Sequence, residues 1–262
     1  MGTSMKIISP KVYIMFIYII YLLLYVPAQG VLEGMYGIGL CEIDYRLSPV
    51  MARSPPYVIA IDPGHGGTDT GALAIAKEYQ VIDKTTAFLY QLLENDPDFV
   101  PVLTRTDSDP ESGPRARTAN DSGAVLLISI HANSDSHQSS KGFECFPTPP
   151  GRPHHRQSLK FAQLIVQQMA DAGHTIRGGE EKTGIKYAYY YGKQKKIVDS
   201  TDTQVRSRQS FGILEKTNCP RVLVEQCFLT NYNDVANWAT DDGCEKAATL
   251  YYNAIKQYFA QI

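Results

Sequence analysis

Two histidines and two glutamates stand at places in the chain where side chains could meet to do chemistry. His65 follows a short β-branched run, His131 ends a continuous apolar run, and Glu225 follows a third run of this kind. Glu78 stands at the start of a segment with helical spacing. Imidazole nitrogens and carboxylate oxygens are ligands of zinc and also carry protons in hydrolysis. These residue types could therefore hold a metal ion and activate water.

A catalytic zinc ion needs three protein ligands and an open position for water. His65, His131 and one of the two glutamates supply such a set, and the other glutamate could then take a proton from water. Glycines beside His65 would let the backbone and a substrate approach closely. A structural interpretation stays open, in which the histidines bond to loop carbonyls and Glu78 only complements the dipole of its helix.

Apolar strands that alternate with amphipathic helices must position these side chains. Strands are predicted at Tyr57–Ile61, Phe99–Leu103, Ala124–Ile130, Gly142–Phe146 and Arg221–Val224. Helices are predicted at Glu78–Leu93, Arg115–Asp121, Ser158–Ala170 and Glu245–Phe259. The alternation predicts an α/β fold, a single domain with a mostly parallel twisted sheet flanked by helices on both faces. Ligands of such sheets gather beyond the carboxyl ends of the strands, so the histidines and Glu225 are expected at one rim. Glu78 starts the helix after the first strand and is close enough in the chain to return to the same rim.

The composition excludes several classes of protein. The chain has 262 residues, of which 44% are hydrophobic and 20% charged, so it is neither disordered nor fibrous. Its 25 basic and 27 acidic residues argue against a dedicated nucleic-acid binder, which usually carries a basic excess. Five cysteines are too few for a disulfide scaffold, and their spacing lacks the CxxC pattern of a thiolate zinc site.

The N-terminus carries the features of a targeting segment. Val12–Val26 is an unbroken apolar and tyrosyl run, with lysines before it and small residues after it. This pattern predicts a signal peptide within residues 1–30, with an uncleaved membrane anchor as the alternative. Residues 31–54 would be a linker and residues 55–262 the catalytic domain. If Met51 is the true start, the N-terminal segment is an artefact.

Six stretches span nearly the whole predicted domain and form a recognisable set. They are Val58–Ala72 (VIAIDPGHGGTDTGA), Lys77–Asp83 (KEYQVID), Leu103–Asp107 (LTRTD), Arg115–Asn120 (RARTAN), Leu126–Ser134 (LLISIHANS) and Pro220–Asn231 (PRVLVEQCFLTN). In this order they resemble the zinc-dependent N-acetylmuramoyl-L-alanine amidases of the type 3 group, which act in bacterial cell-wall turnover. The resemblance implies one zinc ion (Zn2+) held by His65, Glu78 and His131. It also implies Glu225 as the catalytic carboxylate.

The substrate that the resemblance implies is bacterial peptidoglycan, cut at the amide between N-acetylmuramic acid and L-alanine of the stem peptide. The alternatives are a zinc peptidase that acts on the stem peptide and a peptidoglycan-binding module without activity. No nucleic acid is expected as a partner, a membrane only through an uncleaved N-terminal segment, and the sequence identifies no activator protein. We expect a secreted or cell-wall-associated bacterial protein, or a phage protein that is cytoplasmic until lysis if Met51 is the start.

Three further residues have predicted places near the site. Glu144 lies near the start of the strand predicted at Gly142–Phe146 and is the alternative catalytic carboxylate. Asp62 is expected to brace the loop of His65, as a partner outside the ligand set. Cys227 stands where relatives often carry glycine, and it is expected to leave a thiol near the site.

Two stretches are expected to be loops. Residues 173–200 are longer than usual in this family and dense in tyrosine and lysine. A solvated surface loop is favoured there over a flap that contacts glycan or stem peptide. His154 and His155 lie in a stretch rich in proline and glycine and are assigned to a mobile loop.

Overall fold

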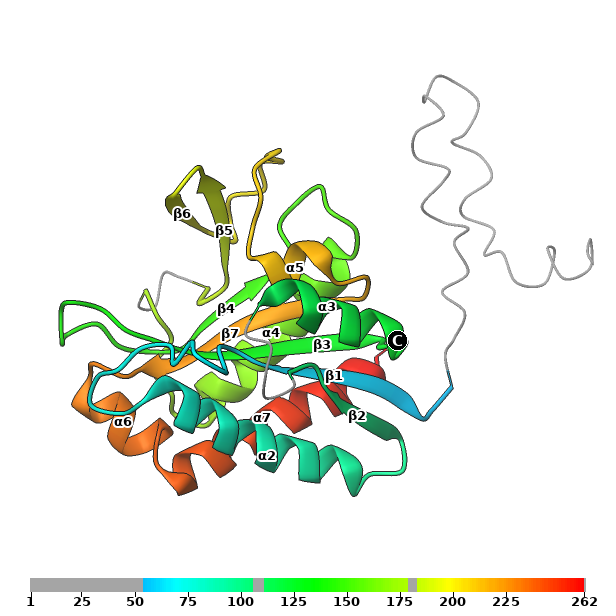
Figure 1. The fold of residues 1–262 in the computed structure, drawn as a ribbon, viewed down its shortest axis with the longest axis horizontal. Coiled ribbons are helices and arrows are strands. Elements are labelled where there is room, and N and C mark those ends of the chain that lie inside the picture. Colours follow the sequence, from blue (N-terminus) through cyan, green and yellow to red (C-terminus); the bar gives the residue numbers. More distant parts are fainter. Residues whose placement is uncertain (1–53, 106–110, 179–182, 262) are drawn as a thin grey trace, which may run out of the picture. The chain divides into compact units, whose positions relative to one another are not determined.

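The computed structural model describes residues 54–105, 111–178 and 183–261, and these form an α/β domain (Figure 1). The predicted signal segment 1–30 and nearly all of the predicted linker lie outside the described residues. Within the described ranges, no helix combines the length and apolar character needed to cross a bilayer.

The central sheet has five strands, and four of them are parallel. The strands are β1 (Tyr57–Pro63), β2 (Phe99–Leu103), β3 (Leu126–Asn133), β4 (Glu144–Pro147) and β7 (Arg221–Phe228). Their order is β2-β1-β3-β7-β4, and only the edge strand β4 runs antiparallel to its neighbour. The parallel pairing of β1 with β2, β1 with β3 and β3 with β7 confirms the predicted mostly parallel sheet. The first five residues of β3, four of them apolar, are all buried, as expected for a parallel strand covered on both faces.

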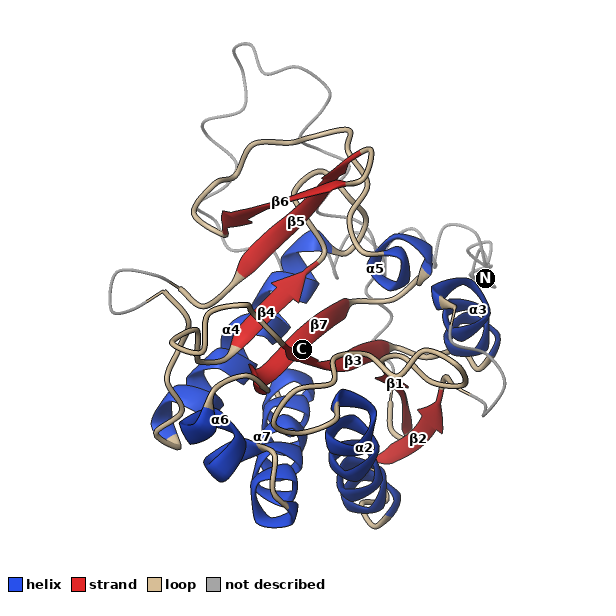
Figure 2. Ribbon diagram, turned by 60° about the vertical axis from the view of Figure 1, so that its left-hand side comes forward, coloured by secondary structure: helices blue, strands red, loops and turns tan. Residues whose placement is uncertain are grey.

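Four helices cover one face of the sheet and enclose the main core (Figure 2). They are α2 (Glu78–Glu94), α4 (His155–Asp171), α6 (Tyr232–Trp238) and α7 (Asp241–Phe259). The buried residues of α2 include a stripe at helical spacing, formed by Val81, Ile82, Thr85, Leu89 and Leu93. Because this stripe fixes the rotation of α2, it also fixes where Glu78, at the start of the helix, can point.

The opposite face carries α3 (Ser112–Asp121), α5 (Gly212–Lys216) and a separate hairpin of β5 (Lys186–Tyr191) and β6 (Gln194–Asp199). A smaller core cluster lies under these elements and joins α3, α5, β5 and the sheet. Asn120 connects α3 to the end of α5 and the residues after it, because its amide donates to the carbonyl of Lys216 and accepts from the N–H of Asn218.

One loop prediction is wrong, and the other is right for His154, which lies in a turn, but wrong for His155. Residues 186–199 form the β5–β6 hairpin instead of a solvated loop, with a two-residue turn at Gly192 and Lys193. Gly192 has φ +63°, a conformation that glycine adopts without steric cost. His155 is the first residue of α4, and its Nδ1 lies 2.8 Å from the carbonyl oxygen of Thr148.

Candidate active site

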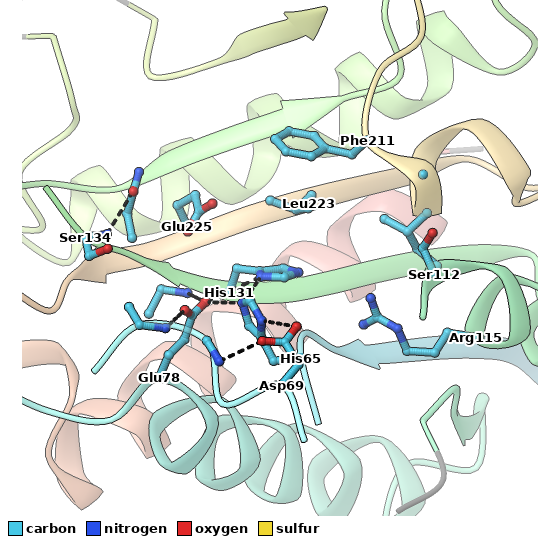
Figure 3. Close-up of a pocket in the computed structure, with 16 residues that line it drawn as sticks. His65, Asp69, Glu78, Ser112, Arg115, His131, Ser134, Phe211, Leu223 and Glu225 are labelled. Carbon is cyan, nitrogen blue, oxygen red and sulfur yellow. Dashed lines mark hydrogen bonds and ion pairs between the residues drawn. The ribbon is translucent and has the colours of Figure 1, made fainter. Parts of the chain in front are cut away.

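The three predicted metal ligands meet at one edge of the sheet (Figure 3). His65 lies in the loop after β1, Glu78 is the first residue of α2, and His131 lies near the end of β3. Since β1 and β3 are adjacent parallel strands, their carboxyl ends lie at the same edge. The structure therefore brings together the side chains that the sequence placed at this rim.

The distances between the three ligand atoms fit a zinc ion. Glu78 Oε1 lies 3.0 Å from His65 Nε2 and 3.4 Å from His131 Nδ1. The two imidazole nitrogens are 3.2 Å apart. Ligand atoms bound at about 2.0–2.1 Å in a tetrahedral site lie about 3.3 Å from one another. Two imidazoles and one carboxylate are moreover the donor set of catalytic zinc sites, which keep one position open.

Hydrogen bonds from outside the set hold two of the ligands in place. Glu78 accepts from the backbone N–H of Ala72 at 2.7 Å and from that of Ala132 at 3.0 Å. His65 Nδ1 lies 2.9 Å from the carboxylate of Asp69. A carboxylate on the second ring nitrogen fixes the tautomer and the orientation of a ligating histidine. Sequence reasoning missed Asp69, although an aspartate four residues after a candidate ligand in a glycine-rich loop was a signal for it.

The metal-free site holds a proton on His65. Burial disfavours the charged ring, but the hydrogen bonds and charges of Glu78 and Asp69 outweigh burial and raise the pKa of His65 to about 9. Burial likewise opposes ionisation of Glu78, but its bonds to His131 and His65 outweigh burial and keep its pKa well below the usual range. The site is thus a charged cluster in which a proton occupies the place that a cation would take.

We expect the affinity of the metal-free protein for zinc to fall about tenfold for each pH unit below about 9. His65 must lose its proton before Nε2 can bind the ion, so binding releases one proton below the pKa of about 9 and none above it. Competition with a chelator of known proton affinity, from about pH 6.5 to 8.5, measures this dependence. In the Asp69→Asn variant the dependence should begin at lower pH. An affinity that is constant over this range would contradict the protonated His65.

At two glycines, a side chain would overlap the metal ligands. A Cβ at Gly64 would lie 2.2 Å from the ring of His131. A Cβ at Gly71 would lie 2.5 Å from Glu78 and 2.8 Å from His65, and its φ of +63° is itself unfavourable for other residues. His65 has φ 59°, a strained conformation for a residue with a side chain. The expected close approach of backbone at this loop is confirmed.

Glu225 lies beside the ligands and outside their set. It is opposite His131 in the register of β3 and β7, and both residues line a cavity of about 570 Å3. The cavity continues past the ligands towards Ser112, Arg115 and Phe211 (Figure 3). A substrate in this cavity would therefore touch the three ligands and Glu225 together.

The surroundings of Glu225 suit proton transfer. Burial raises the pKa of Glu225 to about 8, and the negative charges of Glu78 and Glu144 act in the same direction. A cation held by the three ligands would lower this pKa again by Coulomb attraction. A carboxyl group whose pKa responds in this way near neutrality can accept a proton and return it.

Glu144, the alternative catalytic carboxylate, is held in ion pairs. It is opposite Glu225 across β4 and β7, is 3% exposed and is absent from the cavity lining. Its Oε1 lies 2.7 Å from Arg177 Nε and 2.9 Å from Lys186 Nζ. The structure therefore favours Glu225 as the carboxylate that could reach a substrate.

Asp62 braces the site from within the sheet. It is fully buried and accepts hydrogen bonds from Thr104, from Ser129 at 2.6 Å and from Arg115 at 3.2 Å. Arg115 also donates to the carbonyl of Pro63 at 2.8 Å, which anchors the start of the loop that carries His65. The carboxylate that contacts His65 itself is that of Asp69 and not that of Asp62.

Cys227 is near the site, as predicted, since the charges of Glu225 and Glu78 act on its thiol, but its side chain does not reach the cavity. It is fully buried in the main core and is absent from the cavity lining. The register between β3 and β7 shifts after His131, and this irregularity turns Cys227 to the helix-covered face. Burial raises the pKa of its thiol well above the ordinary value, so the thiol is unreactive.

Comparison with protein families matches residues 59–257 to the Amidase_3 family, which is described as N-acetylmuramoyl-L-alanine amidase. The matched residues lie inside the predicted domain 55–262 and contain the three ligands and Glu225.

Individual relatives carry the same description. The chain is 28% identical to the N-acetylmuramoyl-L-alanine amidase CwlM of Bacillus licheniformis, over 77% of this chain and 68% of that protein. It is 27% identical to the amidase AmiC of Escherichia coli O6:H1, over 79% of this chain and 54% of AmiC. The solved catalytic domain of CwlV, an amidase from Bacillus (Paenibacillus) polymyxa var. colistinus, superposes with a TM-score of 0.60 at 27% identity, covering 78% of this chain and 98% of that domain.

Proposed function

The chain belongs to the N-acetylmuramoyl-L-alanine amidase family, and we infer that it uses a zinc ion to hydrolyse the amide between N-acetylmuramic acid and L-alanine in peptidoglycan. The observation that supports the zinc ion is the set of His65, Glu78 and His131, whose ligand atoms have the spacing of a tetrahedral site. The observation that supports hydrolysis is Glu225 on the wall of the same cavity.

The metal ligands and Glu225 have separate roles in the proposed reaction. An ion held by the three ligands would act as a Lewis acid, polarising the scissile carbonyl and making water more acidic. Glu225 takes a proton from the water molecule as the oxygen bonds to the carbonyl carbon. When the C–N bond breaks, Glu225 passes this proton to the nitrogen of L-alanine. The products are the carboxylate of the lactyl group and a stem peptide with a free amine.

Two alternatives share part of this evidence. A zinc peptidase that cuts within the stem peptide would need the same ligands and the same carboxylate, and the family match favours the amidase. A binding module without activity would need neither a set of catalytic zinc ligands nor Glu225 in the cavity. The geometry of the site therefore supports an enzyme.

Analysis of digested peptidoglycan tests the proposed bond. The zinc-loaded protein should release intact stem peptides that begin with a free L-alanine amine and leave glycan strands with unsubstituted lactyl carboxylates. Mass spectrometry of the soluble and insoluble fractions identifies both products. Stem peptides shortened at an internal bond would show a peptidase, and an unchanged digest from zinc-loaded protein would support the binding module.

We also propose that the protein acts outside the cytoplasm, where peptidoglycan lies. The support is the run Val12–Val26 with its lysine flank, which has the pattern of a secretory signal. This segment lies outside the described residues, and release from a phage-infected cell at lysis is the alternative if Met51 is the start. Fractionation of cells that express the full chain distinguishes the two.

A further inference from the structure

The β5–β6 hairpin presents one face to the wall of the cavity. Tyr190 and Lys195 are directly opposite each other in its register, so their side chains lie on the same face. The Tyr190 ring is 6.1 Å from the ring of Phe211, and Lys195 Nζ is 5.5 Å from the centre of that ring. Phe211 lines the cavity together with Glu225. The hairpin thus extends the cavity wall with one aromatic ring and one ammonium group.

Tyr190 and Lys195 also interact electrostatically with the Glu225 carboxylate. Burial raises the pKa of Glu225, and the charge of Lys195 acts against that rise. Burial also raises the pKa of Tyr190, and the charge of Glu225 adds to it. Lys195 is exposed, and within the described ranges it forms no ion pair. Its ammonium group is therefore available to an anion bound near Glu225.

The other face of the hairpin is occupied by the protein itself. Tyr189 is fully buried, with Arg152 and Arg206 over its ring at 5.9 and 5.0 Å. Lys196, opposite Tyr189, is on this face, and its charge acts on Asp202. At the base of the hairpin, on the face of Tyr190, Lys186 is paired with Glu144. These contacts fix the hairpin, so that Lys195 and Lys196 point to different sides of it.

Given the proposed function, the chemistry of the substrate decides what this wall can bind. If the amide lies at the zinc ligands and Glu225, the glycan would extend to one side of the bond and the stem peptide to the other. The sugars are neutral, whereas the stem peptide carries free carboxylates. Two residues of extended peptide span about 7 Å, so a carboxylate on the second residue of the stem stays close to the cavity.

We propose that Lys195, which lies over the Phe211 ring and beside Tyr190, binds a carboxylate of the stem peptide and makes the enzyme selective for stems in which that group is free rather than amidated. This inference rests on the proposed function. An ammonium group and an exposed carboxylate attract one another modestly in water, so the effect is one of selectivity and not of catalysis. It acts equally on bound substrate and transition state and therefore changes KM and leaves kcat unaltered.

Two soluble muropeptides that differ only in a carboxylate or a carboxamide on the second stem residue test the proposal. The wild-type enzyme should have a KM about fivefold lower for the carboxylate form, with equal kcat. Lys195→Met keeps the apolar stem of the side chain and removes the charge, so it should abolish this preference. Lys196→Met removes the same charge from the same hairpin on its other face and should keep the preference.

The outcomes separate the inference from the function on which it rests. An equal KM for both substrates in the wild type, with free L-alanine amine released, would overturn the role of Lys195 and leave the amidase intact. An equal loss of preference in Lys195→Met and Lys196→Met would also overturn it, because it would show general attraction by a basic hairpin. If the wild type released no stem with a free L-alanine amine, both the function and the inference would fall.

Discussion

Replacing Glu225 with glutamine is expected to lower kcat by about 10^2- to 10^4-fold while zinc remains bound. Glutamine has nearly the same shape but cannot accept the proton of water or return it to the leaving amine. Because Glu225 is outside the ligand set, the zinc content should stay at the wild-type level. Release of stem peptides from purified peptidoglycan, measured beside the zinc content of the same sample, gives both quantities.

The stability of the variant provides a control for misfolding. Burial raises the pKa of Glu225 in the metal-free protein to about 8 from an ordinary value of 4.5, so its charge destabilises the folded state as the pH rises through this window. Glutamine removes that charge, and the metal-free variant should be at least as stable as the wild type at about pH 9. Activity within tenfold of the wild type would show that another group carries the proton.

Glu144→Gln is the matched control for Glu225→Gln, because it makes the same change at the residue opposite Glu225 on the neighbouring strand β4. Glu144 is paired with Arg177 and Lys186, so the substitution weakens the pairing of both cations and should lower stability, although Arg177 keeps a contact of 4.0 Å with Asp135. It should retain kcat within about tenfold, since Glu144 does not line the cavity. The reverse pattern, with Glu144→Gln inactive and Glu225→Gln active, would exchange the roles of the two residues.

Replacing His131 with alanine is expected to weaken zinc binding by more than about 100-fold and to abolish activity at ordinary zinc concentrations. Loss of a partner outside the ligand set already costs about 10- to 100-fold in metal affinity, and loss of a ligand costs more. His131 Nδ1 lies 3.4 Å from Glu78 Oε1 and 3.2 Å from His65 Nε2, so its removal takes away one corner of the site. Titration with a competing chelator measures the affinity.

His137→Ala is the matched control for this substitution. His137 lies in the loop after β3, and its side chain is 79% exposed and contacts Asp135 instead of the site. The same change of residue there should leave both zinc affinity and activity unaltered. Equal zinc binding by His131→Ala and the wild type would show that the ion binds elsewhere.

The edge at which the site forms could be predicted from the sequence, because parallel strands end at a common rim. His65 and His131 each follow an apolar run, and that position alone placed them together. The roles of Glu78 and Glu225 could not be separated by position, since both were expected at the rim. Only the resemblance to a family distinguished them, and the structure places Glu78 among the ligands and Glu225 on the cavity wall in the same arrangement.

The hairpin shows what a single sequence leaves out. Because lysines and tyrosines are frequent in this segment, the sequence predicts that its residues are exposed. Tyr189 is nevertheless buried under Arg152 and Arg206, which come from two segments distant from it in the chain. That burial is a long-range effect, which local patterns do not contain. A local signal was nevertheless present, since Gly192 and Lys193 separate two runs rich in β-forming residues.

The face of β7 on which the Cys227 side chain lies could not be predicted, for a different reason. Strict alternation along β7 would have kept it on the same face as Glu225, but the shift of register between His131 and Asn133 breaks that alternation. A bulge of this kind depends on pairing with β3 and has no signature in β7 alone.

Diffraction at the zinc absorption edge from crystals of active protein tests the central claim most directly. The account predicts one strong anomalous peak about 2.0–2.2 Å from His65 Nε2, Glu78 Oε1 and His131 Nδ1, with the carboxylate of Glu225 nearby but outside bonding distance. A peak at any other place, or one that lacks any of these three ligands, would contradict it.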